Sequence, residues 1–245
     1  AFERFEMAEP NELWQMDFKG YFGMAIDGYC HPLTVLDDHS RFLLVLKACR
    51  DQTTQTVQKH LTQVFREHGM PQRMLMDNGS PWKSPERGYT ALTVWFIRLG
   101  ILISHGRPRH PQTQGKEERL HRTLNDELLR KVELQDLNDC QRAFDKWRFE
   151  YNYERPHDSL DLATPGTRYR ESARPFPEKL PIVLYDDNDI VRKVDAAGRV
   201  YFKNRIFKVG KAFINQPVAL RPSKDDGVYD VYYCDQKVAK LNLLL

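Results

Sequence analysis

The sequence has little of what a membrane-spanning or secreted protein needs. Its longest unbroken run of aliphatic or aromatic residues is Phe42–Leu46, whereas a bilayer-spanning helix needs roughly 20 apolar residues. The first residues, Ala1-Phe2-Glu3-Arg4, do not form a basic segment followed by an apolar one, so they give no sign of secretion. We therefore expect a cytoplasmic protein with no membrane partner.

Cysteines and activated nucleophiles are also scarce. The four cysteines form no CxxC pair and have no histidine at zinc-ligand spacing, which argues against structural zinc and favours reduced core residues. Ser80 and Tyr89 have no identifiable activating base, so a covalent protein intermediate is not expected. The cysteines are Cys30, Cys49, Cys140 and Cys234.

What the chain does have is a sizeable apolar fraction and a basic tail. Its 245 residues are 41% hydrophobic, which is enough to form the core of one or two domains. The net charge of +3 falls entirely after residue 185, and seven Lys or Arg stand against one Asp between residues 192 and 211. Such a basic segment is either a solvated face or a nucleic-acid-binding surface.

The periodicity of the chain predicts three meandering strands followed by alternating helices and strands, hence an α/β fold with a mixed five-stranded sheet flanked by helices. We expect strands at 13–18, 29–36, 42–48, 73–77 and 101–104, and helices at 53–68, 90–99, from 116 onward and at 137–151.

Five of the 14 prolines fall between residues 156 and 181, which predicts an extended connection. Short strand-like runs between residues 190 and 241 then predict a small all-β barrel. The expected division is an arm at 1–10, a catalytic core at 11–152, the connection at 153–185 and the barrel at 186–245.

Three acidic residues stand where separate elements should bring them together. Asp17 lies in the first predicted strand, and Asp77 closes the fourth strand just before the turn signal Asn78-Gly79. The third acid opens the helix that follows the loop 110–115, where Glu117 and Glu118 compete for the role. Glu118 shares a helix face with polar residues, whereas Glu117 lies in line with the leucines of the apolar stripe. We therefore choose Glu118, and we expect Glu117 at the rim of the stripe, with its carboxylate reaching water or an arginine.

At these residues the chain resembles a known family. The segments Trp14–Phe18, Asp77–Ser80 and His110–Arg119 are similar to motifs of the integrase-core (DDE) transposases of bacterial insertion sequences, which are related to retroviral integrases. The likeness continues through Val35–Arg41 and Arg155–Leu160 with Thr164-Pro165, and covers roughly residues 11–170. It implies a ribonuclease-H-like core with Asp17, Asp77 and Glu118 as the DDE triad, followed by a small β-barrel.

Two departures from the family pattern concern the third acid. The interval from Asp77 to Glu118 holds 40 residues, somewhat longer than is usual in the wider family. Relatives commonly carry an aliphatic residue where this chain has Glu117, so the identity of the third ligand stays open between Glu117 and Glu118.

The triad predicts chemistry on a phosphodiester with two Mg²⁺ ions, for which Mn²⁺ would substitute. Three carboxylates without a His or Cys ligand match magnesium better than zinc, and two such ions about 3.5–4 Å apart can activate the attacking oxygen and hold the leaving one. In this interpretation Asp17 bridges both ions, Asp77 holds one and Glu118 holds the other. Water would free a transposon 3′ end, and that 3′-hydroxyl would then attack target DNA. The alternatives are a nuclease that cuts without joining, and a catalytically inactive DNA-binding protein with the same fold.

The expected partners are the transposon ends and target DNA, bound by a homo-oligomer, with no small-molecule substrate. The resemblance also implies a helix-turn-helix module upstream, so we expect the chain to be part of a longer protein. Asp37 and Asp38 end the second predicted strand, where a structural role is favoured. The residues expected to contact DNA are basic ones beside Glu118 and in the tail: Arg107, Arg109, His110, Lys116, Arg119, Arg122, Lys193, Lys203, Arg205 and Lys208.

Overall fold

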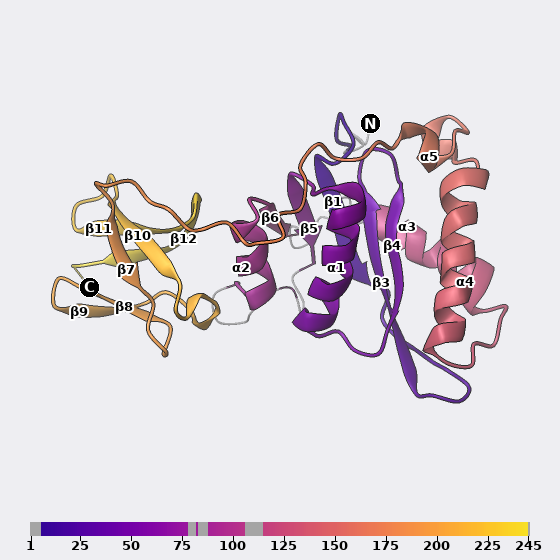
Figure 1. Cartoon of the computed structure of the whole chain (residues 1–245), viewed down its shortest axis with the longest axis horizontal. Coiled ribbons are helices and arrows are strands. Elements are labelled where there is room, and N and C mark those ends of the chain that lie inside the picture. The colour runs from indigo at the N-terminus through magenta and orange to yellow at the C-terminus, as the bar shows by residue number, and fades with distance from the viewer. Residues whose placement is uncertain (1–5, 78–81, 83–87, 106–114, 245) are drawn as a thin grey trace. The chain divides into compact units, whose positions relative to one another are not determined.

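The structure, a computed structural model, describes residues 6–77, 82, 88–105 and 115–244. The chain forms two compact units, one of Ala1–Pro81 with Ile101–Phe176 and the other of Trp82–Gly100 with Pro177–Leu245. The elements of both units are labelled in Figure 1. Because residues 82–100 group with the tail, the contiguous domain bounds expected from the sequence stay a prediction.

The first unit is built on a mixed sheet. β3 pairs antiparallel with both β1 and β4, whereas β5 pairs parallel with β1 and with β6. The observed order β4-β3-β1-β5-β6 confirms the predicted five-stranded mixed sheet, and the short strand β2, which the sequence did not predict, adds to the end of β3. The strands are β1 (Leu13–Phe18), β2 (Phe22–Gly23), β3 (Tyr29–Asp37), β4 (Leu43–Cys49), β5 (Arg73–Met76) and β6 (Leu102–His105).

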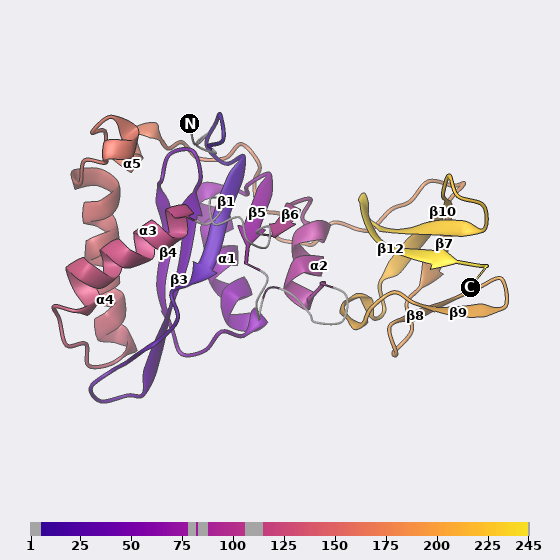
Figure 2. The same cartoon turned by 180° about the vertical axis from the view of Figure 1, so that it is seen from behind.

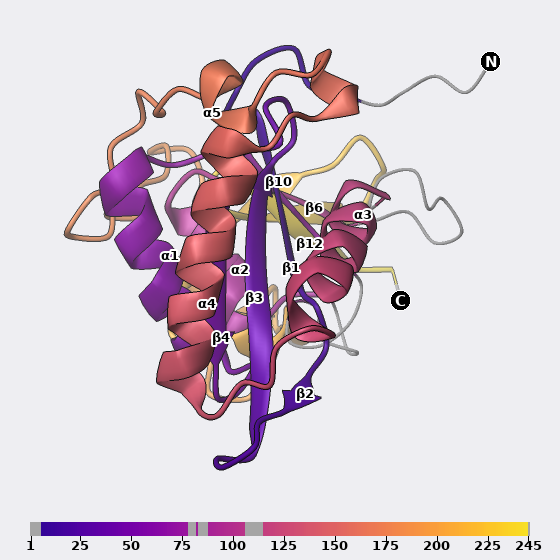
Figure 3. The same ribbon diagram turned by 90° about the vertical axis from the view of Figure 1, so that its right-hand side faces the viewer.

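Helices cover both faces of this sheet. α1 (Thr54–His68) buries one side against the first face, where the rings of Phe65 and Trp14 lie 5.9 Å apart. α3 (Gly115–Leu124) and α4 (Leu137–Phe149) cover the other face, and Figure 3 shows α1 and α3 on opposite sides of β3. The sheet is therefore enclosed between two helical layers, the arrangement expected for an α/β fold.

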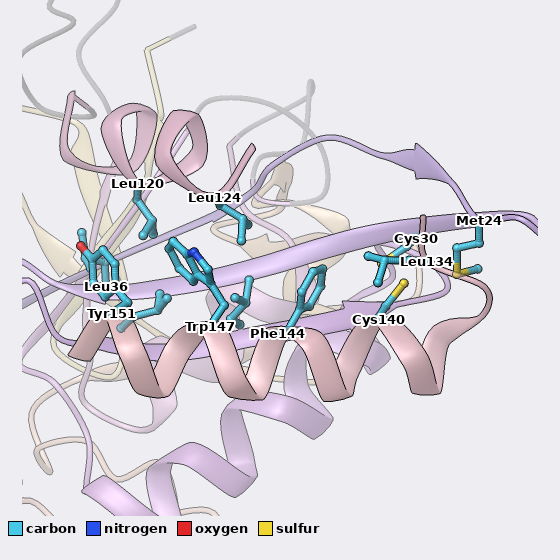
Figure 4. Close-up of a cluster of buried hydrophobic side chains, with 12 residues drawn as sticks. Met24, Cys30, Leu36, Leu120, Leu124, Leu134, Cys140, Phe144, Trp147 and Tyr151 are labelled. Carbon is cyan, nitrogen blue, oxygen red and sulfur yellow. The ribbon is translucent and has the colours of Figure 1, made fainter. Parts of the chain in front are cut away.

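One apolar cluster joins α3 and α4 to the sheet. Leu120 and Leu124 of α3 point toward Trp147 and Phe144 of α4 (Figure 4). This cluster places α3 at a fixed height above β1 and β3, because a close-packed core resists sliding. Its buried members are Met24, Cys30, Leu36, Leu43, Leu46, Leu120, Leu124, Leu134, Cys140, Phe144, Trp147 and Tyr151.

Local sequence signals explain where α1 begins and ends. The Thr53 side chain accepts a hydrogen bond from the Thr56 N–H at the start of the helix, as an N-cap does. Gly69 ends it with φ of 72°, a backbone conformation that side chains disfavour. A Cβ at Gly69 would also lie 2.6 Å from the Ser172 carbonyl oxygen, so this position has no room for another residue.

Shorter helical turns complete the first unit. α3 continues into the π-helical turn η2 (Asn125–Leu129), and α4 continues into a second one, η3 (Glu150–Glu154). The chain then forms the 3₁₀ turn η4 (Asp158–Leu160) and the short helix α5 (Pro165–Arg168). The sequence predicted α3 and α4 but not these turns.

The second unit is all-β apart from α2 (Ala91–Arg98) and the 3₁₀ turn η5 (Lys211–Phe213), which confirms the all-β prediction for the tail. In its described residues, four strands form an antiparallel sheet of order β12-β11-β10-β7, and β8 and β9 form a separate hairpin. Lys203 and Asn204 turn this hairpin with φ of 46° and 59°, as a two-residue type I′ turn requires. The strands are β7 (Ile190–Lys193), β8 (Arg199–Phe202), β9 (Arg205–Lys208), β10 (Pro217–Pro222), β11 (Val228–Tyr233) and β12 (Gln236–Asn242).

Two expectations about composition can be compared with this fold. Cys30, Cys49 and Cys140 are buried free thiols, as predicted, and Cys234 is a half-buried free thiol. Across the described part of the chain, none of the helices is both long and apolar enough to span a bilayer.

Candidate active site

Strand pairing brings the first two acids to neighbouring positions. β1 and β5 run parallel with Trp14 opposite Met74 and Gln15 opposite Leu75. Two residues further along each strand, the same register pairs Asp17 with Asp77, close to the ends of both strands. Because alternate residues of a strand share a face, Asp17 lies on the face of Gln15, which is the face that α3 covers.

The pKa of the Asp17 carboxyl depends on its burial and on the charges around it. The pKa of the Asp17 carboxyl is raised from 3.8 to about 7. Burial is the largest cause, and the nearby charges of Asp77 and Glu118 also contribute to this rise. The Phe18 N–H donates to Asp17 Oδ1 at 2.8 Å, which opposes the rise by stabilising the carboxylate. The predicted acids thus act on one another although they come from three separate elements.

Helix α3 is anchored over Asp17 by the hydroxyl of Thr34. Thr34 is the β3 partner of Asp17 in the antiparallel ladder. Its Oγ1 lies 3.0 Å from Glu117 Oε2, 2.9 Å from His121 Nε2 and 3.0 Å from the Asp17 carbonyl oxygen. Figure 2 shows α3 crossing the sheet beside β3. One hydroxyl therefore ties the first turns of the helix to both central strands.

The Glu117 and His121 side chains meet in a buried contact. Burial, followed by the charge of Asp17, raises the pKa of the Glu117 carboxyl well above its usual value. Burial also lowers the pKa of His121 to about 4, with a contribution from the charge of Lys19. Their contact at 3.5 Å is therefore part of a hydrogen-bonded cluster near neutral pH and not an ion pair.

A second anchor joins the start of α3 to the end of β3. Lys116 Nζ contacts Asp38 Oδ1 at 2.5 Å, and the Gln15 amide donates to the same oxygen at 2.7 Å. Burial lowers the pKa of Lys116 to about 8, although Asp38 opposes that shift. Asp38 is fully buried, which agrees with the structural role expected for it. The contact commits the Lys116 ammonium to the protein interior, so its expected DNA contact has no support from this geometry.

The structure corrects one expectation about the two glutamates. Glu117 was expected at the rim of the apolar stripe, but its side chain is only 3% exposed and accepts its hydrogen bond from Thr34 instead of reaching water or an arginine. Its other oxygen, Oε1, has no hydrogen-bond partner among the described residues, and Glu117 lines a small crevice with Gln15 and Asp17. Glu118, one residue on, is exposed on the outer side of α3.

The donor set at this point suits a divalent cation in its chemistry. Among the residues that the structure describes, no three His, Cys, Asp or Glu side chains stand close enough to share one ion as they are placed. Burial, followed by the charges of Asp77 and Glu118, raises the pKa of the Asp17 carboxyl, so the three acids influence one another. All the donors are carboxylate oxygens, which magnesium prefers.

The residues expected to contact DNA fall into three groups. Arg107, Arg109 and His110 lie outside the described residues. Arg119 and Arg122 are exposed on α3, and Arg119 stands 4.0 Å from the equally exposed Asp158. The tail residues, all exposed, are Lys193, Lys203, Arg205 and Lys208.

Aromatic and carbonyl contacts hold two of the tail cations in place. Lys203 Nζ donates to the Tyr229 hydroxyl at 3.0 Å and lies 5.0 Å from the centre of the Tyr229 ring. The Arg205 guanidinium donates to the Leu243 carbonyl oxygen. A DNA contact by these residues stays a prediction.

Thr34, Gln15 and His121 are site residues that the sequence did not reveal. A threonine and a glutamine inside predicted strands carry no signal of their own. Only His121 had one, because it lies four residues after Glu117 and therefore on the same face of the helix.

The raised pKa of Asp17 predicts a pH-dependent cost to stability. The folded protein holds the Asp17 proton more tightly than the unfolded chain, so ionised Asp17 lowers the free energy of unfolding progressively as the pH rises from 3.8 to about 7. The shift corresponds to a loss of up to about 4 kcal/mol above that range. In metal-free buffer, Asp17→Asn should therefore be more stable than the parent protein at pH 8 and equal to it near pH 4. Urea unfolding followed by circular dichroism measures this, with Asp145→Asn on the exposed side of α4 as the control. A constant difference at both pH values would contradict it.

Comparisons with known proteins agree with this fold and extend over both units. Two family models, each described as an integrase core domain, match residues 7–111 and 99–165. A third, described as the C-terminal domain of IS481 family transposases, matches residues 189–244.

The chain is similar to insertion-element and retroviral proteins. It is 25% identical over 157 residues to the insertion element IS407 uncharacterized 31.7 kDa protein of Burkholderia multivorans, covering 64% of this chain and 54% of that protein. It is 27% identical over 174 residues to the insertion element IS476 uncharacterized 39.2 kDa protein of Xanthomonas euvesicatoria, covering 68% and 49%. The Gag-Pro-Pol polyprotein of sheep pulmonary adenomatosis virus is 32% identical over 123 residues, 49% of this chain and 6% of the polyprotein. The chain thus spans about half the length of the two insertion-element proteins.

A solved structure shares the fold. A chain of the simian T-cell lymphotropic virus intasome in complex with the PP2A regulatory subunit B56 gamma matches with a TM-score of 0.52 and 15% identity, over 97% of this chain and 82% of that one. The two integrase-core matches together span residues 7–165, which is more than half of the sequence. The chain therefore belongs to the integrase-core family, and it carries the C-terminal domain of the IS481 family transposases.

Proposed function

We propose that this chain is the catalytic part of a DDE transposase that cleaves DNA at the 3′ ends of an insertion sequence and joins those ends to target DNA. The observation that carries the proposal is the parallel register of β1 and β5, which brings Asp17 and Asp77 together on the sheet face covered by α3, the helix that carries Glu118. The family of the chain and its two insertion-element relatives support the same reaction.

In this proposal Asp17, Asp77 and Glu118 would hold two Mg²⁺ or Mn²⁺ ions. When bound, such ions supply charge stabilisation for an in-line displacement at phosphorus. The residues of the chain itself would orient the carboxylates that bind the ions. The Phe18 N–H fixes one Asp17 oxygen, and the β1–β5 register places Asp77 beside it.

The anchors of α3 would set the position of Glu118. Lys116 and Glu117 precede it directly and are held by Asp38 and Thr34, so the backbone of Glu118 cannot move without breaking buried contacts. Glu118 itself remains exposed toward solvent, where DNA and metal can approach. The buried side of the first helical turn thus positions the acid on its outer side.

The exposed basic residues would bind DNA backbones. Arg119 and Arg122 follow Glu118 on α3. In the second unit, Lys193, Arg205 and Lys208 lie on strands and Lys203 lies in the turn between β8 and β9. Phosphate contacts by such cations supply affinity without reading sequence. Assembly of two DNA ends would then use a homo-oligomer.

The test is a reaction of the purified chain with a labelled duplex that carries the element's end, with a supercoiled plasmid as target. We expect a nicked 3′ end and a joined product in Mg²⁺ or Mn²⁺, and neither product in EDTA. A second substrate that already has a free 3′-hydroxyl tests joining alone. Nicking of the uncut duplex without joining of this second substrate would instead support the nuclease alternative. DNA binding without any metal-dependent product would support the inactive alternative.

A further inference from the structure

The Asp38 carboxylate joins three parts of the first unit. Asp38 directly follows β3, and its side chain is fully buried. Its Oδ1 accepts a hydrogen bond from the Gln15 amide of β1 at 2.7 Å and pairs with Lys116 Nζ of α3 at 2.5 Å. Its Oδ2 accepts a hydrogen bond from the N–H of Met7, in the segment that leads into β1, at 2.8 Å. The two oxygens of one carboxylate are therefore held by different elements.

Two further contacts hold that leading segment, residues 6–7, against the residues after β3. His39 Nδ1 lies 2.9 Å from the Met7 carbonyl oxygen, and the ring nitrogen donates because a carbonyl oxygen can only accept. The Glu6 carboxylate pairs with the Arg41 guanidinium at 2.7 Å, and Arg41 is buried. Residues 6–7 are thus fixed beside the carboxylate that receives Lys116.

Lys116 depends on Asp38 for its opposite charge. Burying an ammonium group is unfavourable unless an anion accompanies it in good geometry. Lys116 Nζ also lies 3.1 Å from the Asp38 carbonyl oxygen, so the side chain and the main chain of one residue both receive it. Lys116 and Glu118 belong to the same first turn of α3. A displaced Lys116 would therefore move the backbone that carries Glu118.

We propose that Asp38 is a positioning residue for Glu118, and that residues 6–7 act through it. The Met7 N–H holds one oxygen of the Asp38 carboxylate, the oriented carboxylate holds Lys116, and Lys116 holds the first turn of α3. The inference rests on the proposed function, because it takes Glu118 as a metal ligand. It gives residues 6–7 a part in the active site although they contain none of the candidate ligands.

The principal variant is Asp38→Asn, whose amide has one acceptor oxygen where the carboxylate has two. It cannot accept from both Met7 and Lys116, so one of these contacts is lost. We expect the dissociation constant for Mn²⁺, measured by calorimetry, to rise by about 10-fold, as for the loss of a contact that orients a metal ligand. In metal-free protein, hydrogen exchange of the amides of residues 119–124 should become at least about 3-fold faster, whereas exchange in α1 should not change.

A pair of variants in the leading segment decides the question if Asp38→Asn does not fold. Glu6→Gln removes the ion pair with Arg41. Glu9→Gln is the matched control, because it removes the ion pair that Glu9 forms with Arg170 at 2.6 Å, away from Asp38. We expect Glu6→Gln to weaken Mn²⁺ binding by about 2- to 5-fold, since it acts one contact further from Glu118, and Glu9→Gln to leave it unchanged.

The inference is overturned if folded Asp38→Asn binds Mn²⁺ as the unchanged protein does, or if Glu6→Gln and Glu9→Gln have equal effects. Faster exchange throughout the protein with unchanged Mn²⁺ binding would likewise mean that Asp38 only stabilises the fold. Failure of the proposed function gives a different pattern, because Glu118→Gln would then leave Mn²⁺ binding unchanged as well.

Discussion

Replacing Asp17 with Asn is expected to reduce DNA cleavage and joining on the order of 10³-fold. In the proposed function Asp17 would hold both metal ions, and the charges of both other candidate ligands act on it. Divalent ions supply several kcal/mol of charge stabilisation to such a reaction, and about 4 kcal/mol corresponds to about 10³ in rate. The amide oxygen of Asn can still accept the Phe18 N–H, so the fold should be retained.

Single-turnover cleavage of a labelled duplex in Mg²⁺ measures this loss. Asp145→Asn makes the same chemical change on the exposed side of α4 and should keep the parent rate. Circular dichroism separates loss of activity from loss of folding. A folded Asp17→Asn protein with more than a tenth of the parent rate would rule out the proposed role of Asp17.

The two adjacent glutamates provide the second large expected effect, and each is the control of the other. Glu118→Gln should lose on the order of 10²- to 10³-fold in rate, because a neutral amide is a poor ligand for Mg²⁺. Glu117→Gln should stay within about 10-fold of the parent rate, as expected for a residue that orients a ligand instead of binding metal. The physical reason is that Glu117 is buried and hydrogen-bonded to Thr34, and burial raises its pKa, which disfavours the ionised form that binds metal.

The same single-turnover assay distinguishes the two glutamates, and metal affinity measured by calorimetry gives a second readout. Glu118→Gln should weaken Mn²⁺ binding, whereas Glu117→Gln should leave it nearly unchanged. Full activity in Glu118→Gln combined with loss in Glu117→Gln would transfer the ligand role to Glu117.

Much of the fold followed from local signals. The predicted strand 13–18 matches β1 residue for residue, because alternating apolar and polar residues define a strand locally. Helix α1 was equally clear, with its Thr53 cap and its stop at Gly69. The two-residue strand β2 and the π-helical turns were missed, since they depend on partners distant in the chain and not on periodicity.

The candidate site also has parts that local sequence predicted and parts that it did not. Asp17 and Asp77 could be placed at strand ends from turn signals alone, and the helical face of Glu118 followed from its spacing. The partners of Lys116 and Glu117 could not be predicted, because periodicity says which side of a helix faces the protein but not which atoms stand opposite. Glu117 was expected to reach water or an arginine and Lys116 to contact DNA, whereas in the structure they contact Thr34 and Asp38.

By itself, the sequence determined the order of helices and strands and the candidate acids that they carry, because both depend on residues close together in the chain. Only the tertiary structure decided which of two neighbouring glutamates is buried and that Lys116 is paired with Asp38 inside the protein. The physical reason is that burial and charge pairing are properties of atoms brought together across the sheet, and no local pattern contains them.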